Sequence, residues 1–236
     1  QHNNVFYKNF LGHKKISSWD EIPIMTKADL QQPLEKRLSR DFKIKEVFVN
    51  KTSGSSGHPF SFAKDKYAHA LTWANIIKLY QQHHIEMGQS LEARFYGIPK
   101  SGISHYKEQL KDKFAKRYRF DIFDLSDNAL AEFLKIFQKK NFEFINGYTS
   151  SIVRFAKYLK AQNKVLKKEC PSLKLCITTS EMLFENDREL LEKQFGVPIV
   201  NEYGASELDV IAFENTDKDW LINTKTLLVE VVDEDG

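Results

Sequence analysis

Hydrophobic and polar positions along the chain alternate in two different ways. Between 65 and 84 the apolar residues recur near helical spacing, which predicts one long helix. Short apolar or alternating runs predict strands, and the stretches between them predict further helices. The predicted strands span 42–49, 93–98, 120–125, 143–146, 173–178 and 198–202, and the predicted helices span 104–116, 126–140, 149–162 and 185–195.

Local side chains mark where some of these elements begin. Thr26 and Asp29 have the spacing of a capping box, so a helix is predicted to start there. Ser126 and Thr149 stand where an N-cap hydroxyl is expected, because each directly precedes a helical pattern.

Strands that alternate with helices over this length predict an α/β fold, with a mainly parallel sheet flanked by helices. The C-terminal segments 210–214 and 227–232 are predicted as extra β strands, which favours a separate small sheet. No internal repeat or linker is visible, so residues 1–236 are taken as one domain. The chain has no initiating Met and stops at Asp235-Gly236, so both ends are expected to be cut from a longer protein.

The composition is that of an ordinary globular protein, and it argues against several classes. Lys and Arg total 35 against 32 Asp and Glu, a balance that argues against partners such as nucleic acid or a membrane surface. Two cysteines, Cys170 and Cys176, make a zinc site improbable and fit a reducing cytoplasm. His83 and His84 close the long helix and are expected to face solvent. Nothing in the pattern indicates an oligomeric state.

Unusual residues follow four of the predicted strands. Ligands of open α/β sheets bind beyond the carboxyl ends of the strands, so segments at these positions are predicted to share one site. The segments are rich in Gly, hydroxyl groups and carboxylates: Thr52–Gly57, Gly147-Tyr148, Thr179-Ser180-Glu181 and Tyr203-Gly204-Ala205-Ser206-Glu207.

The first of these segments carries four hydroxyl groups and two glycines, which suit a polyphosphate because several backbone N–H groups can point at one anion. A flexible surface turn is the alternative. The segment Thr52–Gly57 is not a Walker A loop, because Gly54 and Gly57 are too close together and no Lys follows. It is one residue too short for the nucleophile elbow G-x-S-x-G.

Carboxylates and aromatic residues at these strand ends allow two interpretations each. Glu207 suits Mg²⁺, which takes one or two carboxylates together with phosphate oxygens, or it is a charge at a helix N-terminus. Glu181 is likewise a site carboxylate or a first-turn charge. Phe95, Tyr96 and Tyr148 either line a pocket for an organic acid or belong to the core.

In this order, the segments resemble the motifs of the adenylate-forming superfamily. Thr52-Ser53-Gly54-Ser55-Ser56-Gly57-His58-Pro59 is similar to its Ser/Thr/Gly-rich phosphate loop, and Tyr203-Gly204-Ala205-Ser206-Glu207 is similar to its Tyr-Gly-x-Thr-Glu motif. The branch that it resembles is that of the phenylacetate–CoA ligases and their capsular-polysaccharide-associated relatives. Three further stretches carry that likeness: 19–27, 145–151 and 229–236.

The resemblance implies an acyl-CoA-synthetase-like ligase that uses ATP to convert a small carboxylic acid to an acyl-adenylate, with release of pyrophosphate. Coenzyme A or another acceptor would then take the acyl group. By position, Thr52, Ser53, Gly54, Ser55, Ser56 and Gly57 would hold the β- and γ-phosphates; Ser206 would contact the α-phosphate; and Glu207 would bind Mg²⁺. Ser180, Glu181, Met182, Asn201, Glu202, Tyr203 and Gly204 would surround the nucleotide, and Tyr96, Gly97 and Tyr148 would border the acid.

The chain departs from the family pattern in two respects. Phe60 stands where many members have a Lys, which removes one phosphate contact. The ribose-binding Asp and the small C-terminal domain with its catalytic Lys would lie beyond this chain, so residues 1–236 would be an incomplete N-terminal core domain of low activity by itself. The alternative function is a non-catalytic relative that binds a nucleotide or a carboxylate and serves polysaccharide biosynthesis.

Overall fold

The computed structural model describes residues 3–12, 14–52, 59–97 and 103–231. The chain forms two compact units. We call residues 75–204 and 210–225 the sheet unit, and residues 1–74, 205–209 and 226–236 the hairpin unit. The long helix α3, Lys66–Gln81, starts in the hairpin unit and ends in the sheet unit, and its bounds are close to the predicted span 65–84.

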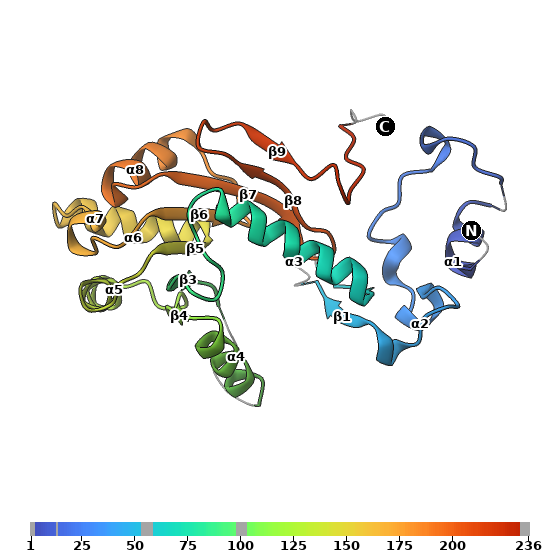
Figure 1. Cartoon of the computed structure of the whole chain (residues 1–236), viewed down its shortest axis with the longest axis horizontal. Coiled ribbons are helices and arrows are strands. Elements are labelled where there is room, and N and C mark those ends of the chain that lie inside the picture. The colour runs from blue at the N-terminus through green and yellow to red at the C-terminus, as the bar shows by residue number, and fades with distance from the viewer. Residues whose placement is uncertain (1–2, 13, 53–58, 98–102, 232–236) are drawn as a thin grey trace. The chain divides into compact units, whose positions relative to one another are not determined.

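The sheet unit is built on one seven-stranded sheet with the order β4-β3-β5-β6-β7-β8-β9 (Figure 1). Strands β4, β3, β5, β6 and β7 pair in parallel, as the strand–helix alternation predicts. The strands are β3 Glu92–Phe95, β4 Arg117–Arg119, β5 Phe144–Tyr148, β6 Leu175–Thr179, β7 Ile199–Ala205, β8 Asp209–Glu214 and β9 Trp220–Ile222. The predicted α/β class with a mainly parallel sheet flanked by helices is therefore confirmed.

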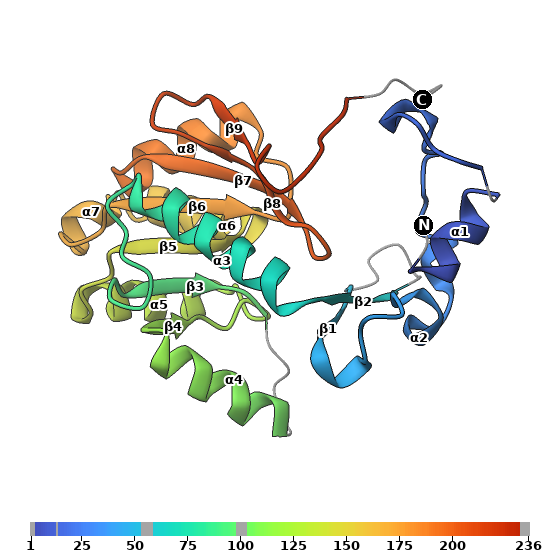
Figure 2. The ribbon, with the colours of Figure 1, turned by 45° about the vertical axis from the view of Figure 1, so that its right-hand side comes forward.

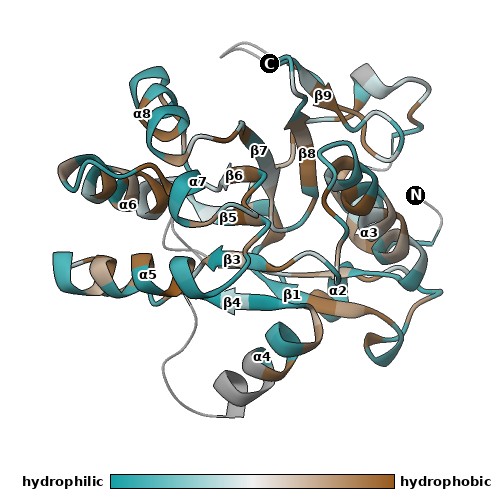
Figure 3. Cartoon of the chain, turned by 60° about the vertical axis from the view of Figure 1, so that its left-hand side comes forward, coloured by the Kyte–Doolittle hydropathy of each residue, from teal (hydrophilic) through white to brown (hydrophobic). Residues whose placement is uncertain are grey.

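Helices cover both faces of this sheet (Figures 2 and 3). On one face, which we call the helical face, lie α5, α6, α7 and α8; on the other, the α3 face, lies the C-terminal half of α3. The helices that follow α3 are α4 Ile103–Phe114, α5 Asp127–Lys139, α6 Thr149–Ala161, α7 Leu166–Glu169 and α8 Glu185–Phe195. Helix α5 begins as predicted, because the Ser126 hydroxyl accepts a hydrogen bond from the Ala129 N–H at 3.4 Å.

The core of the helical face is rich in phenylalanine. The rings of Phe95 and Phe120 lie 4.9 Å apart, and those of Phe120 and Phe137 lie 5.2 Å apart and nearly parallel. Each aromatic side chain removes ~150–250 Å² from water, so these contacts are a main source of stability. Further members of the cluster are Phe133, Phe142, Phe155 and Phe195.

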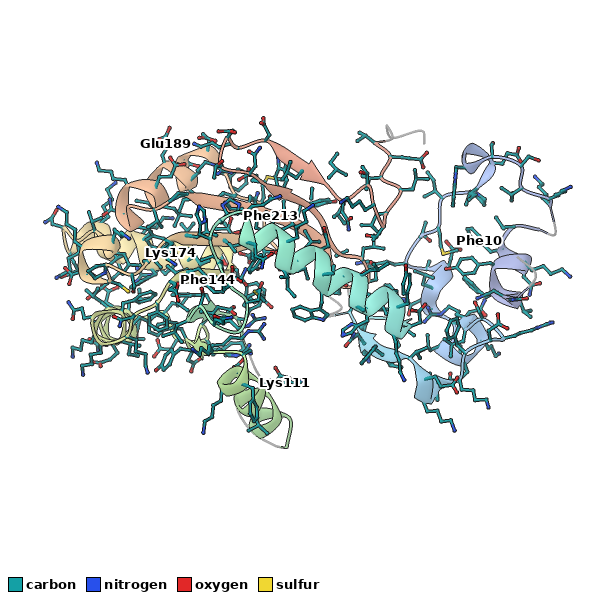
Figure 4. All side chains as sticks on the ribbon, viewed as in Figure 1. Phe10, Lys111, Phe144, Lys174, Glu189 and Phe213 are labelled. Atoms are coloured by element: carbon teal, nitrogen blue, oxygen red, sulfur yellow. The ribbon has the colours of Figure 1, made fainter. Side chains whose placement is uncertain are left out.

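The core of the α3 face is smaller and mixes rings from helix and sheet. The Tyr80 ring of α3 lies 5.9 Å from Phe144 and 5.8 Å from Phe213 (Figure 4). Leu175, Ile177 and Val200 complete this apolar layer. Toward the carboxyl ends of the same strands the side chains become polar, which sets up the candidate site.

The hairpin unit has few buried side chains. Strands β1, Phe48–Lys51, and β2, Ser61–Lys64, pair antiparallel. The buried apolar residues of its N-terminal part are Phe6, Leu34, Phe60 and Phe62. Its other elements are α1 Val5–Phe10, η1 Trp19–Glu21, η2 Asp29–Gln31, α2 Leu34–Arg37 and η3 Ile44–Glu46.

One predicted strand begins later than expected and another is wrong, because local hydrogen bonds override the hydrophobic alternation. In 42–49, the Lys43 N–H donates to the Glu46 carboxylate at 3.0 Å, and a 3-10 turn precedes the strand, which starts only at Phe48. In 120–125, the Asp121 carboxylate accepts from the Phe123 N–H at 3.1 Å, and the backbone forms a turn here where a strand was predicted. The strand of this region is β4, directly before it.

Other predictions need smaller corrections. The Thr26 N–H and hydroxyl bond Asp29 at 2.7 and 2.6 Å, but only one 3-10 turn follows. Thr149 is the first residue of α6, whereas the N-cap position is Tyr148. The C-terminal strands form no separate small sheet: β8 and β9 join the main one, and the described part of 227–232 contains no strand.

The histidine prediction is half right. His84 is exposed, but His83 is buried, and its ring Nε2 lies 3.3 Å from the Glu214 carbonyl oxygen. Within the part of the chain that the structure describes, no helix has the length and apolar character needed to cross a membrane.

Candidate active site

Three of the four predicted segments lie at the same edge of the sheet unit. Because β3, β5, β6 and β7 are parallel and paired in register, their carboxyl ends meet at this edge. Tyr96-Gly97 follows β3, Tyr148 ends β5, and 180–182 follows β6. Residues 201–204 lie within the last part of β7.

Two tyrosines form an aromatic wall at this edge. The ring of Tyr96 lies 4.8 Å from that of Tyr148, and both side chains are half-buried. Two glycines determine how the backbone packs behind them. A Cβ on Gly147 would lie 2.4 Å from the Phe95 carbonyl oxygen, and one on Gly97 would lie 2.6 Å from the Phe123 ring. The wall therefore depends on close approach of β3 to β5.

Charged groups lie beneath this wall on the α3 face. The guanidinium carbon of Arg94 lies 4.4 Å from the centre of the Tyr96 ring, and its Nη1 donates to Glu92 at 2.7 Å. Glu92 is almost fully buried and also pairs with the Nε of Arg117 at 2.8 Å. One buried carboxylate thus holds two arginines from neighbouring strands.

The hydroxyls of Tyr80 and Tyr96 stay protonated at neutral pH, because the pKa of each is raised. Burial raises the pKa of Tyr96, and the charge of Glu202 raises it further. Burial also raises the pKa of Tyr80 well above its ordinary value, with a second contribution from Glu202. The Asn146 amide donates to the Tyr80 hydroxyl at 3.2 Å. Both phenols are therefore available as hydrogen-bond donors at neutral pH.

The segment after β6 is tied to the start of α6. Ser180 has a positive φ of 68°, an uncommon backbone conformation for serine. The Glu181 carboxylate accepts from the Ser150 N–H at 2.6 Å, and the Glu181 carbonyl accepts from the Thr149 hydroxyl at 3.2 Å. Glu181 therefore caps the N-terminus of α6, while Met182 is largely exposed.

A cavity of about 380 Å³ opens beside this cap. It lies between the first turns of α6 and the segment that leads into α8. Its lining residues are Thr149, Ser150, Val153, Arg154, Lys157, Glu181, Met182, Phe184 and Asp187.

The last residues of β7 differ in how tightly they are held. The Glu202 carboxylate accepts from the Thr179 hydroxyl at 3.1 Å, and the Asn201 amide oxygen lies 3.5 Å from the Thr178 hydroxyl. Tyr203 and Gly204 are exposed. β7 thus presents fixed polar groups first and a free aromatic face after them.

Ser206 and Glu207 lie in the turn between β7 and β8, where the Leu208 N–H donates to the Ala205 carbonyl at 3.1 Å. Ser206 is exposed and Glu207 is half-buried. The interpretation of Glu207 as a helix N-terminal charge is wrong, because no helix starts there. A carboxylate on such a turn is the type of oxygen ligand that Mg²⁺ takes together with phosphate oxygens, so Glu207 fits the predicted metal role.

The predicted phosphate loop is described only at its base. The Thr52 N–H donates to the Phe60 carbonyl at 3.0 Å, and the Thr52 hydroxyl accepts from the Phe60 N–H at 3.1 Å. The predicted residues Ser53, Gly54, Ser55, Ser56 and Gly57 lie outside the described residues. These two bonds close the base of the β1–β2 hairpin below the loop.

Sequence reasoning missed the charged layer of Glu92 and Arg94. The signal was present in the sequence, because the two charges alternate with Ala93 and Phe95, but the predicted strand began only at Ala93 and left Glu92 outside it. An alternating charge in a central strand indicates a polar patch on one face of the sheet. Its partner Arg117 lies on β4, which was not predicted, so the pairing could not be seen.

Comparison with known proteins agrees with this fold. No known family model matches the chain. The chain is 26% identical to Protein CapK of Staphylococcus aureus over 97% of its own length, and covers 51% of that protein. A structure of 2-hydroxyisobutyryl-CoA ligase in complex with 2-HIB-AMP and CoA is similar with a TM-score of 0.65 and 12% identity, covering 94% of this chain and 54% of the ligase.

A malonyl-CoA ligase complex with methylmalonyl-CoA and AMP gives a TM-score of 0.51 at 19% identity, over 72% of this chain and 35% of that one. The chain spans about half the length of CapK and of the first ligase.

Proposed function

The chain has the fold of the adenylate-forming CoA ligases, and from this premise we propose that it is the N-terminal core of an enzyme that activates a carboxylic acid with ATP. The acid becomes an acyl-adenylate, pyrophosphate is released, and coenzyme A or another acceptor takes the acyl group. The observation that carries the proposal is the edge of the sheet where Tyr96 contacts Tyr148 and where the strands before Glu181 and around Glu202 end. The likeness to CapK supports the branch predicted from the sequence. A role in polysaccharide biosynthesis and a cytoplasmic location belong to the same proposal.

In the reaction, a carboxylate oxygen of the acid attacks the α-phosphorus of ATP. The bond from that phosphorus to the oxygen bridging the α- and β-phosphates breaks, and pyrophosphate leaves with both electrons. No protein nucleophile is needed. The main task of the protein is to bring two anions together and to stabilise the charge on the reacting phosphate with oriented donors.

Each predicted residue keeps its role in this proposal. Tyr96, Gly97 and Tyr148 border the acid; Ser180, Glu181, Met182, Asn201, Glu202, Tyr203 and Gly204 surround the nucleotide; Ser206 contacts the α-phosphate; and Thr52 to Gly57 hold the outer phosphates. Glu207 would hold Mg²⁺, which supplies charge neutralisation between the phosphates when it is bound. The exposed ring of Tyr203 supports an aromatic contact with the adenine.

A non-catalytic relative that binds nucleotide or a carboxylate is the second candidate. The observation that favours it is Phe60, which stands where many family members have a Lys and is itself buried. Its ring lies 5.8 Å from the guanidinium carbon of Arg37, so it serves the hairpin unit and offers no charge to a phosphate.

The deciding experiment measures pyrophosphate release by the full-length protein with Mg²⁺-ATP, hydroxylamine as the acyl trap and a panel of carboxylic acids. We expect acid-dependent release, and a loss of about 100-fold, or ~3 kcal/mol in the transition state, in Glu207→Ala. Glu189→Ala is the matched control, because Glu189 is an exposed carboxylate on α8 (Figure 4). Release at the normal rate in Glu207→Ala would refute the metal role. ATP binding without release for any acid would favour the non-catalytic candidate.

A further inference from the structure

Arg94 is a half-buried cation with one hydrogen-bond donor that no described residue accepts from. One guanidinium nitrogen, Nη1, donates to Glu92 at 2.7 Å. The Nε is buried, and no described residue accepts its hydrogen bond. An arginine carries five N–H donors and no acceptor. With 22% of its side chain exposed, Arg94 is also reachable from outside the core.

An unmade hydrogen bond of this kind is costly. A buried donor without an acceptor costs ~1–3 kcal/mol, which is why native structures seldom leave one unpaired. The cost is removed if a ligand supplies the acceptor. The guanidinium carbon of Arg94 lies 4.4 Å from the centre of the Tyr96 ring, which puts the guanidinium next to the aromatic wall proposed to border the acid.

The charges around Arg94 indicate what kind of acceptor fits. Glu92 already neutralises one charge, and it is shared with Arg117. Glu202 adds a second carboxylate whose charge is felt by the Tyr96 hydroxyl. Two carboxylates already match the two arginines, so an additional carboxylate from a ligand would leave the region with an excess of negative charge. A hydroxyl avoids that repulsion, because it accepts from Arg94 and can donate its own proton to a carboxylate or a phenol oxygen.

We propose that Arg94 is a specificity-determining residue of the acid site, and that it donates to a hydroxyl group carried by the acid in addition to its reacting carboxylate. This inference rests on the proposed function, and it narrows the substrate to hydroxylated acids. A site built to bond a substrate hydroxyl discriminates strongly against the analogue that lacks it, because the buried protein group is then left unpaired.

The test compares acids that differ by one hydroxyl. Calorimetry on the full-length protein, with AMP present, measures the affinity for benzoate against 4-hydroxybenzoate and for butyrate against 4-hydroxybutyrate. We expect the wild type to bind the hydroxylated member of at least one pair at least 10-fold more tightly. Arg94→Met is expected to reduce that preference to less than 3-fold. Arg117→Met is the control, because Arg117 shares the partner Glu92, whereas among the described residues the cation over the Tyr96 ring is Arg94.

The outcomes separate this inference from the proposed function. Equal affinity within both pairs for the wild type overturns the inference even if Arg94→Met fails to fold, and so does a preference that survives in Arg94→Met. A preference that depends on Arg94 without pyrophosphate release keeps the inference and refutes the ligase function. Pyrophosphate release without any preference for the hydroxylated acids keeps the ligase function and overturns the inference. An absence of binding for all four acids overturns the inference.

Discussion

Two arginines of the sheet unit, the buried Arg188 and the half-buried Arg94, differ in how completely they are paired. Arg188 of α8 gives two hydrogen bonds to Glu214, at 2.7 and 2.9 Å, and a third to the Ile199 carbonyl at 3.1 Å. Arg94 gives one to Glu92 and retains a buried Nε without an acceptor among the described residues. Both are held by a carboxylate that is almost fully buried.

The difference in pairing distinguishes Arg188, whose charge serves stability, from Arg94, whose charge we propose serves binding. The Glu214 carboxylate also accepts from the Asn201 N–H at 2.9 Å, so the pair links α8 to β7 and β8 and leaves little for a ligand. At Arg94 the donors are incompletely used, and the half-buried Tyr96 covers them. Complete pairing indicates a role in stability, and incomplete pairing at a strand end indicates a role in binding.

The largest effect is expected from Arg188→Met. Glu214 would be left buried with no cation in contact among the described residues, and breaking a buried ion pair in this way costs ~3–5 kcal/mol. Urea unfolding should show a fall of about 4 kcal/mol in the free energy of unfolding. Lys174→Met is the control: Lys174 pairs with Glu143 at 2.7 Å but is well exposed, so its loss should cost less than about 1 kcal/mol.

A smaller loss of stability is expected from Arg94→Met. Glu92 keeps its ion pair with Arg117, so its carboxylate still has a cation as partner. The substitution also removes the buried Nε that has no acceptor. We expect the free energy of unfolding to fall by about 1.5 kcal/mol in the same urea experiment, mainly from one charged hydrogen bond. A loss as large as that of Arg188→Met would contradict the contrast between the two sites.

The smallest effect concerns His83, next to the Arg188–Glu214 pair. Burial lowers the pKa of His83 from 6.5, so the unfolded chain binds a proton at a higher pH than the folded chain does. Stability is therefore complete above about pH 6.5 and falls as the pH drops below it. The limit is ~1.4 kcal/mol per pH unit, and we expect about 0.5 kcal/mol because solvent screening reduces the effect.

Urea unfolding at pH 7.5 and pH 5.5 measures this difference. His83→Gln should lose less stability than the wild type between the two values, whereas the exposed His84→Gln should behave like the wild type. An identical pH dependence in all three proteins would show that His83 does not titrate differently on folding.

The sequence predicted the parallel sheet and most helices because their signals are local. Helix α8 has the predicted bounds, and the Ser126 cap of α5 forms as expected. Strand β9 was missed because it is three residues long and exposed, so it carries no alternation. His83 was misjudged because its burial comes from Phe213, which lies 5.7 Å away and 130 residues later in the chain.

For the site, the sequence indicated which residues would lie at the sheet edge but could not give their pairings. Tyr96 and Tyr148 were predicted together, and they are in ring contact. Arg94 was overlooked because its importance depends on Glu92 and on the ring above it, which only the fold brings together. The nucleotide and metal roles of Thr52 to Gly57, Ser206 and Glu207 stay predictions.

The glycine at the end of β5 has a practical consequence for redesign. A single added methyl group at Gly147 would meet the Phe95 backbone at 2.4 Å and force apart the strands that carry Tyr96 and Tyr148. The width of the proposed acid pocket would thus be limited by the backbone. An engineer who wishes to admit a bulkier substrate should shorten the tyrosines and leave this position untouched.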